Sequence, residues 1–224
     1  MNEHNLDARD GQVTEAGLAR PITEGTPANP SAPAVVDTDR IAVAVRDILL
    51  AIGEDPDRDG LVRTPERVAA AYTELFAGLR EDPRRHLAVT FDEEHRELVV
   101  LRDIPFASVC EHHLLPFTGH AHIGYVPRGR VVGLSKLARL VEGYARRPQV
   151  QERMTSAIAD ALMEELRPDG CGVVIEATHT CMTIRGIQKP GATMVTSAVR
   201  GSFQRRPETR AEFFAIVRHR DGGT

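Results

Sequence analysis

The sequence predicts an α+β fold in which helices precede a domain of two strands, two helices and two further strands. Apolar residues first recur every three to four positions, as in helices, and the period shortens to two over residues 97–106 and 118–126, as in strands. Helical spacing returns over residues 133–166. Two more strand-like runs follow at residues 171–182 and 191–200, and so the helices lie between two pairs of strands.

The N-terminal region is expected to contain a disordered tail followed by a helical unit. Residues 1–36 are rich in proline and polar residues and have hardly any large apolar side chain, so they cannot offset the entropy cost of ordering. We predict a helical unit over residues 37–90, a main domain over residues 91–219 and a short tail over residues 220–224. In the helical unit, a first apolar stripe comprises Ile41, Val45, Ile48, Leu49 and Ile52.

Several residues are predicted to begin helices. Thr64 is a candidate N-cap, with Pro65 in the first turn of the second helix. Ser135 is a candidate N-cap for a helix over residues 133–146. Pro148 is expected to open the next helix, and a C-terminal helix is expected from about Pro207.

Composition restricts the classes of function. A formal net charge of -4 provides no long-range attraction for nucleic acid or an anionic membrane, so an anionic ligand needs a local basic cluster. There are three cysteines, and two of them stand beside histidines. This pattern favours metal or thiol chemistry in a reducing compartment over a disulfide framework. With no apolar run of membrane-spanning length and no export signal, we expect a cytoplasmic protein.

Two short segments contain the residues of a candidate metal site. Cys110, His112 and His113 follow one extended run, and His179 and Cys181 alternate along another, so that both should face the same side of a strand. Thiolate and imidazole are the ligands that zinc prefers. We predict that Cys110, His113 and Cys181 hold one zinc ion and leave a fourth position open, as in catalytic sites. His112 should point elsewhere, and His112 and His179 are predicted to transfer protons.

Each of these residues also has a simpler interpretation. A cysteine is often a small buried apolar residue, and Cys171, which has no histidine nearby, is assigned to the core. His120 and His122 alternate on one face of a strand and could mimic a metal pair. We expect those two histidines at the surface or in an interface, because the metal motif does not need them.

Three longer blocks resemble the signature regions of a known family. They are CEHHLLPFTGHAHIGYVP, GLSKLARLVEGYARRPQVQERM and THTCMTIRGIQKPGATMVTSAVRGSF. The chain resembles zinc-dependent GTP cyclohydrolase I over about residues 40–219. The resemblance implies the tunnelling fold, an antiparallel four-stranded sheet with two helices on one face. It also implies a homo-oligomer in which the sheets join into five-subunit barrels, and two barrels stack as a decamer.

The resemblance implies a reaction and roles for individual residues. GTP and two waters would give formate and 7,8-dihydroneopterin triphosphate, the first step of tetrahydrofolate and pterin synthesis. His112 and His179 would be the acid–base pair, and Ser135 would lie near the ribose. Histidine suits this role because its unperturbed pKa is about 6.5.

Substrate contacts also follow from the resemblance. Glu152, with Gln151 beside it, would recognise guanine, because a carboxylate can accept paired hydrogen bonds from guanine N–H groups that adenine lacks. The predicted triphosphate ligands are Lys136, Arg139, Arg185 and Arg67. Without the resemblance, the cations would be read as solvated surface charges and Glu152 as a residue stabilised by the helix dipole.

Two alternative functions belong to other classes. The first is a different enzyme, either of the same fold, such as a pterin synthase or a deazaguanine reductase, or a zinc nucleobase deaminase. A deaminase would need a Pro-Cys-x-x-Cys motif, which the sequence lacks. The second is a nucleotide-binding or assembly protein without catalysis, which the complete Cys and His set disfavours. Downstream pathway and feedback regulation are not encoded in these motifs.

Overall fold

A computed structural model describes residues 35–219 of the chain. The predicted C-terminal tail and all but the last two residues of the predicted N-terminal tail lie outside this range. The helices are α1 (Thr38–Ala51), α2 (Thr64–Leu75), α3 (Leu134–Ala145), α4 (Gln151–Glu165), α5 (Thr180–Thr183), α6 (Ser202–Arg205) and α7 (Pro207–Arg218), with short 3-10 helices η2 (Ala77–Arg80) and η3 (Pro83–Ala88). The strands are β1 (Thr90–Asp92), β2 (Val99–Cys110), β3 (Pro116–Val126), β4 (Arg130–Val132), β5 (Pro148–Gln149), β6 (Gly170–His179) and β7 (Met194–Gly201). Over this range, none of the helices has both the length and the apolar character needed to cross a membrane.

The main sheet has the order β5-β2-β3-β6-β7. Strands β2, β3, β6 and β7 are antiparallel neighbours, as the resemblance implied. A fifth strand that the sequence analysis missed, β5, runs parallel to the end of β2 and pairs Pro148 with Val109 and Gln149 with Cys110. Strands β1 and β4 form a separate two-stranded ribbon. The predicted α+β class is therefore confirmed.

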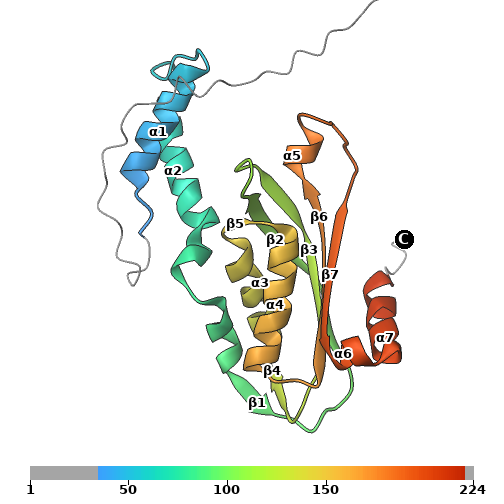
Figure 1. Cartoon of the computed structure of the whole chain (residues 1–224). Coiled ribbons are helices and arrows are strands. Elements are labelled where there is room, and N and C mark those ends of the chain that lie inside the picture. Colours follow the sequence, from blue (N-terminus) through green and yellow to red (C-terminus); the bar gives the residue numbers. More distant parts are fainter. Residues whose placement is uncertain (1–34, 220–224) are drawn as a thin grey trace, which may run out of the picture. The chain divides into compact units, whose positions relative to one another are not determined.

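Helices cover both faces of the sheet (Figure 1). On one face, α3 and α4 bury the main core, in which Phe117, Leu137 and Ile158 are fully buried. On the other face, α6 and α7 cover a smaller apolar cluster. Side chains alternate between the two faces along β6, since Ile175 belongs to the main core and Val174 to the smaller cluster.

The N-terminal helices pack against each other, but the apolar stripe of α1 is only partly buried. Leu49 is its one buried member, whereas Ile48 and Ile52 are 58% and 69% exposed. Asp37 caps α1 by accepting a hydrogen bond from the backbone N–H of Arg40. Thr64, predicted to cap α2, is instead its first residue, and no side chain caps that helix.

Two other predicted helix starts are wrong. Ser135 is the second residue of α3, and its N-cap is Gly133, whose extended backbone begins the helix without a side-chain hydrogen bond. Pro148 does not open a helix, because Pro148 and Gln149 are held extended by pairing with β2. The following helix therefore begins only at Gln151.

His122 is buried, although it was expected at the surface or in an interface; its side chain lies at an irregularity in β2. The pairing of β2 with β3 shifts between Leu101 and Ile104, and Asp103 there has a φ of 56°. The Asp103 backbone N–H donates to Nδ1 of His122 at 3.2 Å. Burial lowers the pKa of His122, which keeps the ring neutral and able to accept this hydrogen bond. His120 is exposed, as expected.

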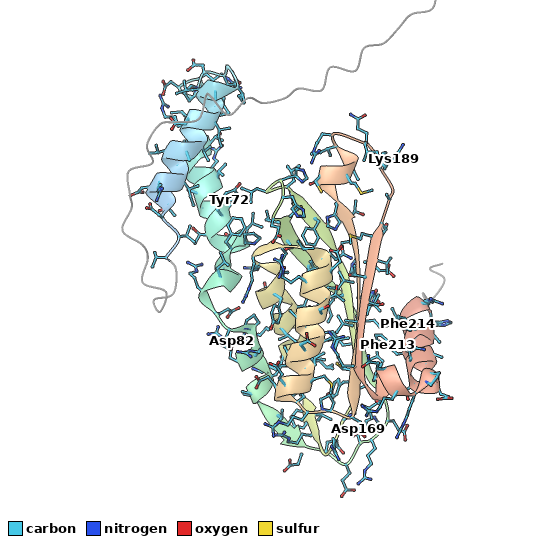
Figure 2. All side chains as sticks on the ribbon, viewed as in Figure 1. Tyr72, Asp82, Asp169, Lys189, Phe213 and Phe214 are labelled. Atoms are coloured by element: carbon cyan, nitrogen blue, oxygen red, sulfur yellow. The ribbon has the colours of Figure 1, made fainter. Side chains whose placement is uncertain are left out.

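Phe213 of α7 (Figure 2) packs against bare backbone of the neighbouring strands β3 and β6. Gly124 and Gly172 pair directly across β3 and β6. A Cβ atom at either position would lie within 2.7 Å of the Phe213 ring. The ring thus occupies the space that side chains would otherwise fill, and Phe203 packs edge-on to it at 5.4 Å between ring centroids.

We predict that Phe213→Ala lowers the free energy of unfolding by about 3–5 kcal/mol, because it leaves a cavity over the two glycines. Chemical denaturation of the purified variant would measure the loss. Phe214→Ala is the matched control, since Phe214 is only partly buried beside the same cluster, and it should cost clearly less. Equal losses for the two variants would contradict this account of the packing.

Candidate metal centre and active site

The loop from Cys110 to Leu115 brings a cysteine and a histidine together at the end of β2. The backbone N–H groups of His113 and Leu114 donate to the carbonyl of Cys110, and the Cys110 N–H donates to the carbonyl of Leu115. Leu114 has a φ of 52°, which closes this tight turn. As a result, Nδ1 of His113 lies 4.0 Å from Sγ of Cys110.

The third candidate ligand, Cys181, lies in a different local structure from the one predicted. Strand β6 ends at His179, and Cys181 is in the one-turn helix α5 rather than alternating with His179 on a strand. The Thr180 hydroxyl donates to the carbonyl of Pro116 at 2.6 Å, which holds α5 against the start of β3. The predicted convergence nevertheless occurs. One ligand atom from each of Cys110, His113 and Cys181 lies within 4.8 Å of the other two.

The spacing and chemistry of these three residues fit a metal ion. Tetrahedral coordination at about 2.0–2.3 Å separates ligand atoms by about 3.3–3.8 Å, close to the observed spacing. Burial raises the pKa of the Cys181 thiol, and the neighbouring Cys110 raises it further. A divalent cation would reverse this effect, because thiols that bind metal are deprotonated. Three protein ligands leave one tetrahedral position for water or substrate.

His112 was expected to point away from the candidate ligands, but it does not. Its Nδ1 lies 3.8 Å from Sγ of Cys110, as near as the nitrogen of His113. The His112 and His113 rings are 6.2 Å apart and inclined at 75°. His112 therefore lies beside the candidate metal position, although it is not one of the three residues whose ligand atoms are mutually close.

His179, the last residue of β6, is held by contacts on two sides. Its ring stacks on the fully buried ring of Phe117, with centroids 4.4 Å apart and planes inclined by 6°. Its Nε2 lies 2.8 Å from Oε1 of Gln151, at the start of α4. Burial lowers the pKa of His179, partly offset by the negative charge of Glu152, so the ring is neutral near pH 7.

The two residues expected to contact guanine differ in exposure. The Glu152 carboxylate is exposed, close enough to His179 to influence its pKa. The amide of Gln151 is buried and already paired with atoms of the chain itself. Glu152 is thus free to meet a ligand, whereas Gln151 is not.

An ion pair that the sequence analysis missed connects the metal loop to α4. Arg153 makes two hydrogen bonds of 2.7 and 3.0 Å to the carboxylate of Glu111, which lowers the pKa of Glu111. The Glu111 backbone N–H also donates to the carbonyl of Gln149. The position of Glu111 between Cys110 and His112 indicated that it lies near the candidate metal site. The sequence alone could not predict that Arg153 pairs with it.

The predicted cationic ligands are not all near the metal candidates. Arg185 is exposed and close enough to Cys181 to lower the pKa of its thiol. Arg139 lines a cavity of about 500 Å³ between α2, β2 and α3, which includes none of the three candidate metal ligands. Arg67 is exposed on α2.

Ser135 and Lys136 lie at the opposite end of α3 from the metal loop. The C-terminal end of α3 leads into β5, which pairs with Cys110, whereas both residues are in its first turn. Ten residues of helix separate Ser135 from Ala145, or about 15 Å at 1.5 Å per residue. The described chain therefore does not bring these two residues to its own metal candidates.

These features define a class of protein: an α+β protein with a three-ligand Cys-His-Cys site that could hold a catalytic metal. Comparison with known proteins identifies the family. The family model for GTP cyclohydrolase I matches residues 41–218. The chain belongs to the GTP cyclohydrolase I family.

Relatives named GTP cyclohydrolase 1 match over most of the chain. The protein from Carboxydothermus hydrogenoformans is 61% identical over 186 residues, which cover 83% of this chain and 97% of the relative. The protein from Thermobifida fusca is 61% identical over 219 residues, which cover 97% and 98% of the two chains. A solved structure of the archaeosine synthase QueF-Like reaches a TM-score of only 0.39 at 19% identity, over 46% of this chain and 93% of that one.

We predict that the purified protein contains one metal ion per chain. Cys181→Ala should lose most of this metal, because only two protein ligands remain to hold the ion. Elemental analysis of the dialysed protein measures the content. Cys171→Ala is the matched control, since Cys171 is fully buried in the core and its thiol donates to the carbonyl of Ala159. Metal retained by Cys181→Ala, or lost equally from both variants, would contradict the assignment.

Proposed function

We propose that this protein hydrolyses and rearranges GTP to 7,8-dihydroneopterin triphosphate and formate, with a zinc ion held by Cys110, His113 and Cys181. Membership of the family makes the chain an enzyme that converts GTP in the first step of folate and pterin synthesis. The convergence of Cys110, His113 and Cys181 is the observation on which the mechanism rests. When bound, zinc would act as a Lewis acid and lower the pKa of a coordinated water from ~15.7 to ~7.

The histidines supply the proton transfers in this proposal. His179 is neutral near pH 7 because its pKa is lowered, so it can accept a proton from the attacking water. His112 has a nitrogen beside Cys110 and can protonate the guanine nitrogen released when the imidazole ring opens. The stack on Phe117 supports this role for His179, since it limits tilting of the ring.

Guanine recognition is assigned to Glu152. Its carboxylate is exposed at the first turn of α4, next to His179, and can accept two hydrogen bonds from the N–H groups of guanine. Adenine lacks this pair of donors and would leave the carboxylate poorly paired. The reacting carbon would then lie between the base contact and the metal.

The triphosphate and ribose contacts are proposed to come from more than one copy of the chain. Arg185 lies on the metal side of its own chain, and Lys136, Arg139, Arg67 and Ser135 complete the site from other copies. The separation of about 15 Å along α3 supports this arrangement. The two sheet edges also support an assembly of several copies, which we propose to be a homodecamer. Most of β2 and the outer side of β7 have no partner strand among residues 35–219. Edge-to-edge pairing into barrels would satisfy these backbone groups.

We further propose a cytoplasmic location and the domain division at residue 90. The three cysteines are all free, which suits a reducing compartment. The first 36 residues are not assigned a role in the reaction.

The direct test is to incubate the purified protein with GTP and measure formate together with the fluorescence of the oxidised neopterin product. Cys181→Ala should lower formate release by orders of magnitude. A metal-free protein with full activity would overturn the proposed mechanism.

We predict that Glu152→Ala raises the Kd for GTP by at least about tenfold, because it removes two charge-assisted hydrogen bonds to guanine, while metal content stays unchanged. Calorimetry with a non-hydrolysable GTP analogue measures the affinity. Glu165→Ala, an exposed carboxylate in the last turn of the same helix, is the control and should bind normally. Normal turnover of GTP by Glu152→Ala would require guanine recognition elsewhere.

We also predict that two inactive variants complement each other. Cys181→Ala and Lys136→Ala should each be nearly inactive alone, because each damages every site. Co-expression should restore formate release at about a quarter of the sites, where an intact metal set meets an intact Lys136 from another copy. No recovery, with mixed oligomers verified by mass, would place each site within one chain.

A further inference from the structure

The amide of Gln151 makes a complete set of hydrogen bonds inside the chain. Its nitrogen lies 3.0 Å from the carbonyl oxygen of Ile175, 3.1 Å from that of Met194 and 3.1 Å from Oγ1 of Thr196. Its oxygen lies 2.8 Å from Nε2 of His179. The residue is 1% exposed, so water does not compete for these groups.

The orientation of this amide follows from its neighbours. Backbone carbonyls only accept hydrogen bonds, so the end of the amide that faces Ile175 and Met194 must be the nitrogen. If the amide were turned around, three oxygens would crowd together and only the Thr196 hydroxyl could donate. The amide oxygen therefore has to face His179.

This orientation determines which nitrogen of His179 carries hydrogen. An amide oxygen has no hydrogen to donate, so Nε2 of His179 must be the donor. A neutral imidazole carries hydrogen on only one nitrogen, and Nδ1 is therefore left with its lone pair. Nδ1 has no hydrogen-bond partner in the described part of the chain, and the stack on Phe117 holds the ring plane.

We propose that Gln151 is a positioning residue that holds His179 in the tautomer with hydrogen on Nε2, so that Nδ1 is the nitrogen that accepts the proton during GTP hydrolysis. This inference rests on the proposed function and deepens it. It replaces the guanine contact that the resemblance implied for Gln151, and Glu152 remains the proposed guanine ligand.

Two threonines extend the hydrogen-bond network around the amide. Oγ1 of Thr155 lies 2.7 Å from the backbone carbonyl of Gln151 and 2.6 Å from Oγ1 of Thr196. The single Thr155 hydrogen goes to the carbonyl, so Thr196 donates to Thr155. The Thr196 oxygen is then a third acceptor, after the Ile175 and Met194 carbonyls, for the two hydrogens of the Gln151 amide. The three bonds form a closed ring that joins α4 to β7: the Gln151 amide donates to Thr196, Thr196 to Thr155, and Thr155 to the Gln151 backbone carbonyl.

Nitrogen-15 NMR of the full-length protein, with isotope-labelled histidine, tests the tautomer directly. Spectra are recorded well above the ordinary histidine pKa of about 6.5, and the His179 signals are identified by their loss in His179→Asn. Wild type should show hydrogen on Nε2 alone, and Gln151→Met should show a mixture of tautomers. Hydrogen on Nδ1 in the wild type would overturn the proposal, and this result does not depend on whether the variant folds.

Kinetics distinguishes positioning from substrate binding. Gln151→Met should lower kcat for formate release by at least about tenfold, as expected for a misplaced base, and change KM for GTP by less than about threefold. A raised KM with unchanged kcat would show instead that Gln151 holds the substrate. Metal content should be unchanged, since Gln151 is not one of the three ligands.

Thr155→Val is the matched control for general damage to this buried region. It removes bonds to the Gln151 backbone and to Thr196 but leaves the contact between the amide and His179. It should lower stability and keep the tautomer of the wild type; a mixture equal to that of Gln151→Met would overturn the assignment to Gln151. Absence of formate from wild-type protein would reject the proposed function, while the spectra would still decide the tautomer.

Discussion

The candidate site depends on the register between β3 and β6. Phe117 pairs with His179, so the loop that precedes β3 and the helix that follows β6 meet at the same end of the sheet. Cys110 and Cys181, 71 positions apart in the chain, come together for this reason. A slip of one residue would turn His179 to the opposite face and separate its ring from Phe117. The ten residue pairs of this ladder make such a slip costly, because one face of the sheet packs in the main core.

The residue types at the site could be predicted better than their local geometry. Cys110, His113 and Cys181 were selected by ligand chemistry, and the fold brings them together. The expectation that Cys181 continues a strand was wrong, because the next partner of β6 after Phe117 would be Pro116. Proline has no N–H to donate to a ladder, and the Thr180 side chain bonds to the Pro116 carbonyl instead. The chain then turns into α5. A period-two pattern contains no information about where the partner strand ends.

Other features depended on contacts between distant segments. The short strand β5 forms because Pro148 and Gln149 meet the end of β2, and nothing in their local sequence predicts this pairing. The buried state of Gln151 reflects the carbonyls of β6 and β7, whereas its position in the sequence, beside the exposed Glu152, favours a substrate contact. By contrast, the α+β class, the four antiparallel strands and the helices α3, α4 and α7 follow from apolar periodicity and family resemblance, since long periodic segments constrain the fold most strongly.

The ring of Phe213 over Gly124 and Gly172 also controls how water reaches the sheet. Paired glycines leave backbone amides without side-chain cover, and such amides ordinarily exchange hydrogen with solvent quickly once a strand loosens. Here the ring is the cover, so exchange around Gly124, near the end of β3, and Gly172, near the start of β6, requires α7 to detach first. Transient opening of the last helix, rather than fraying of the strands, would then set the local stability of the sheet in this region.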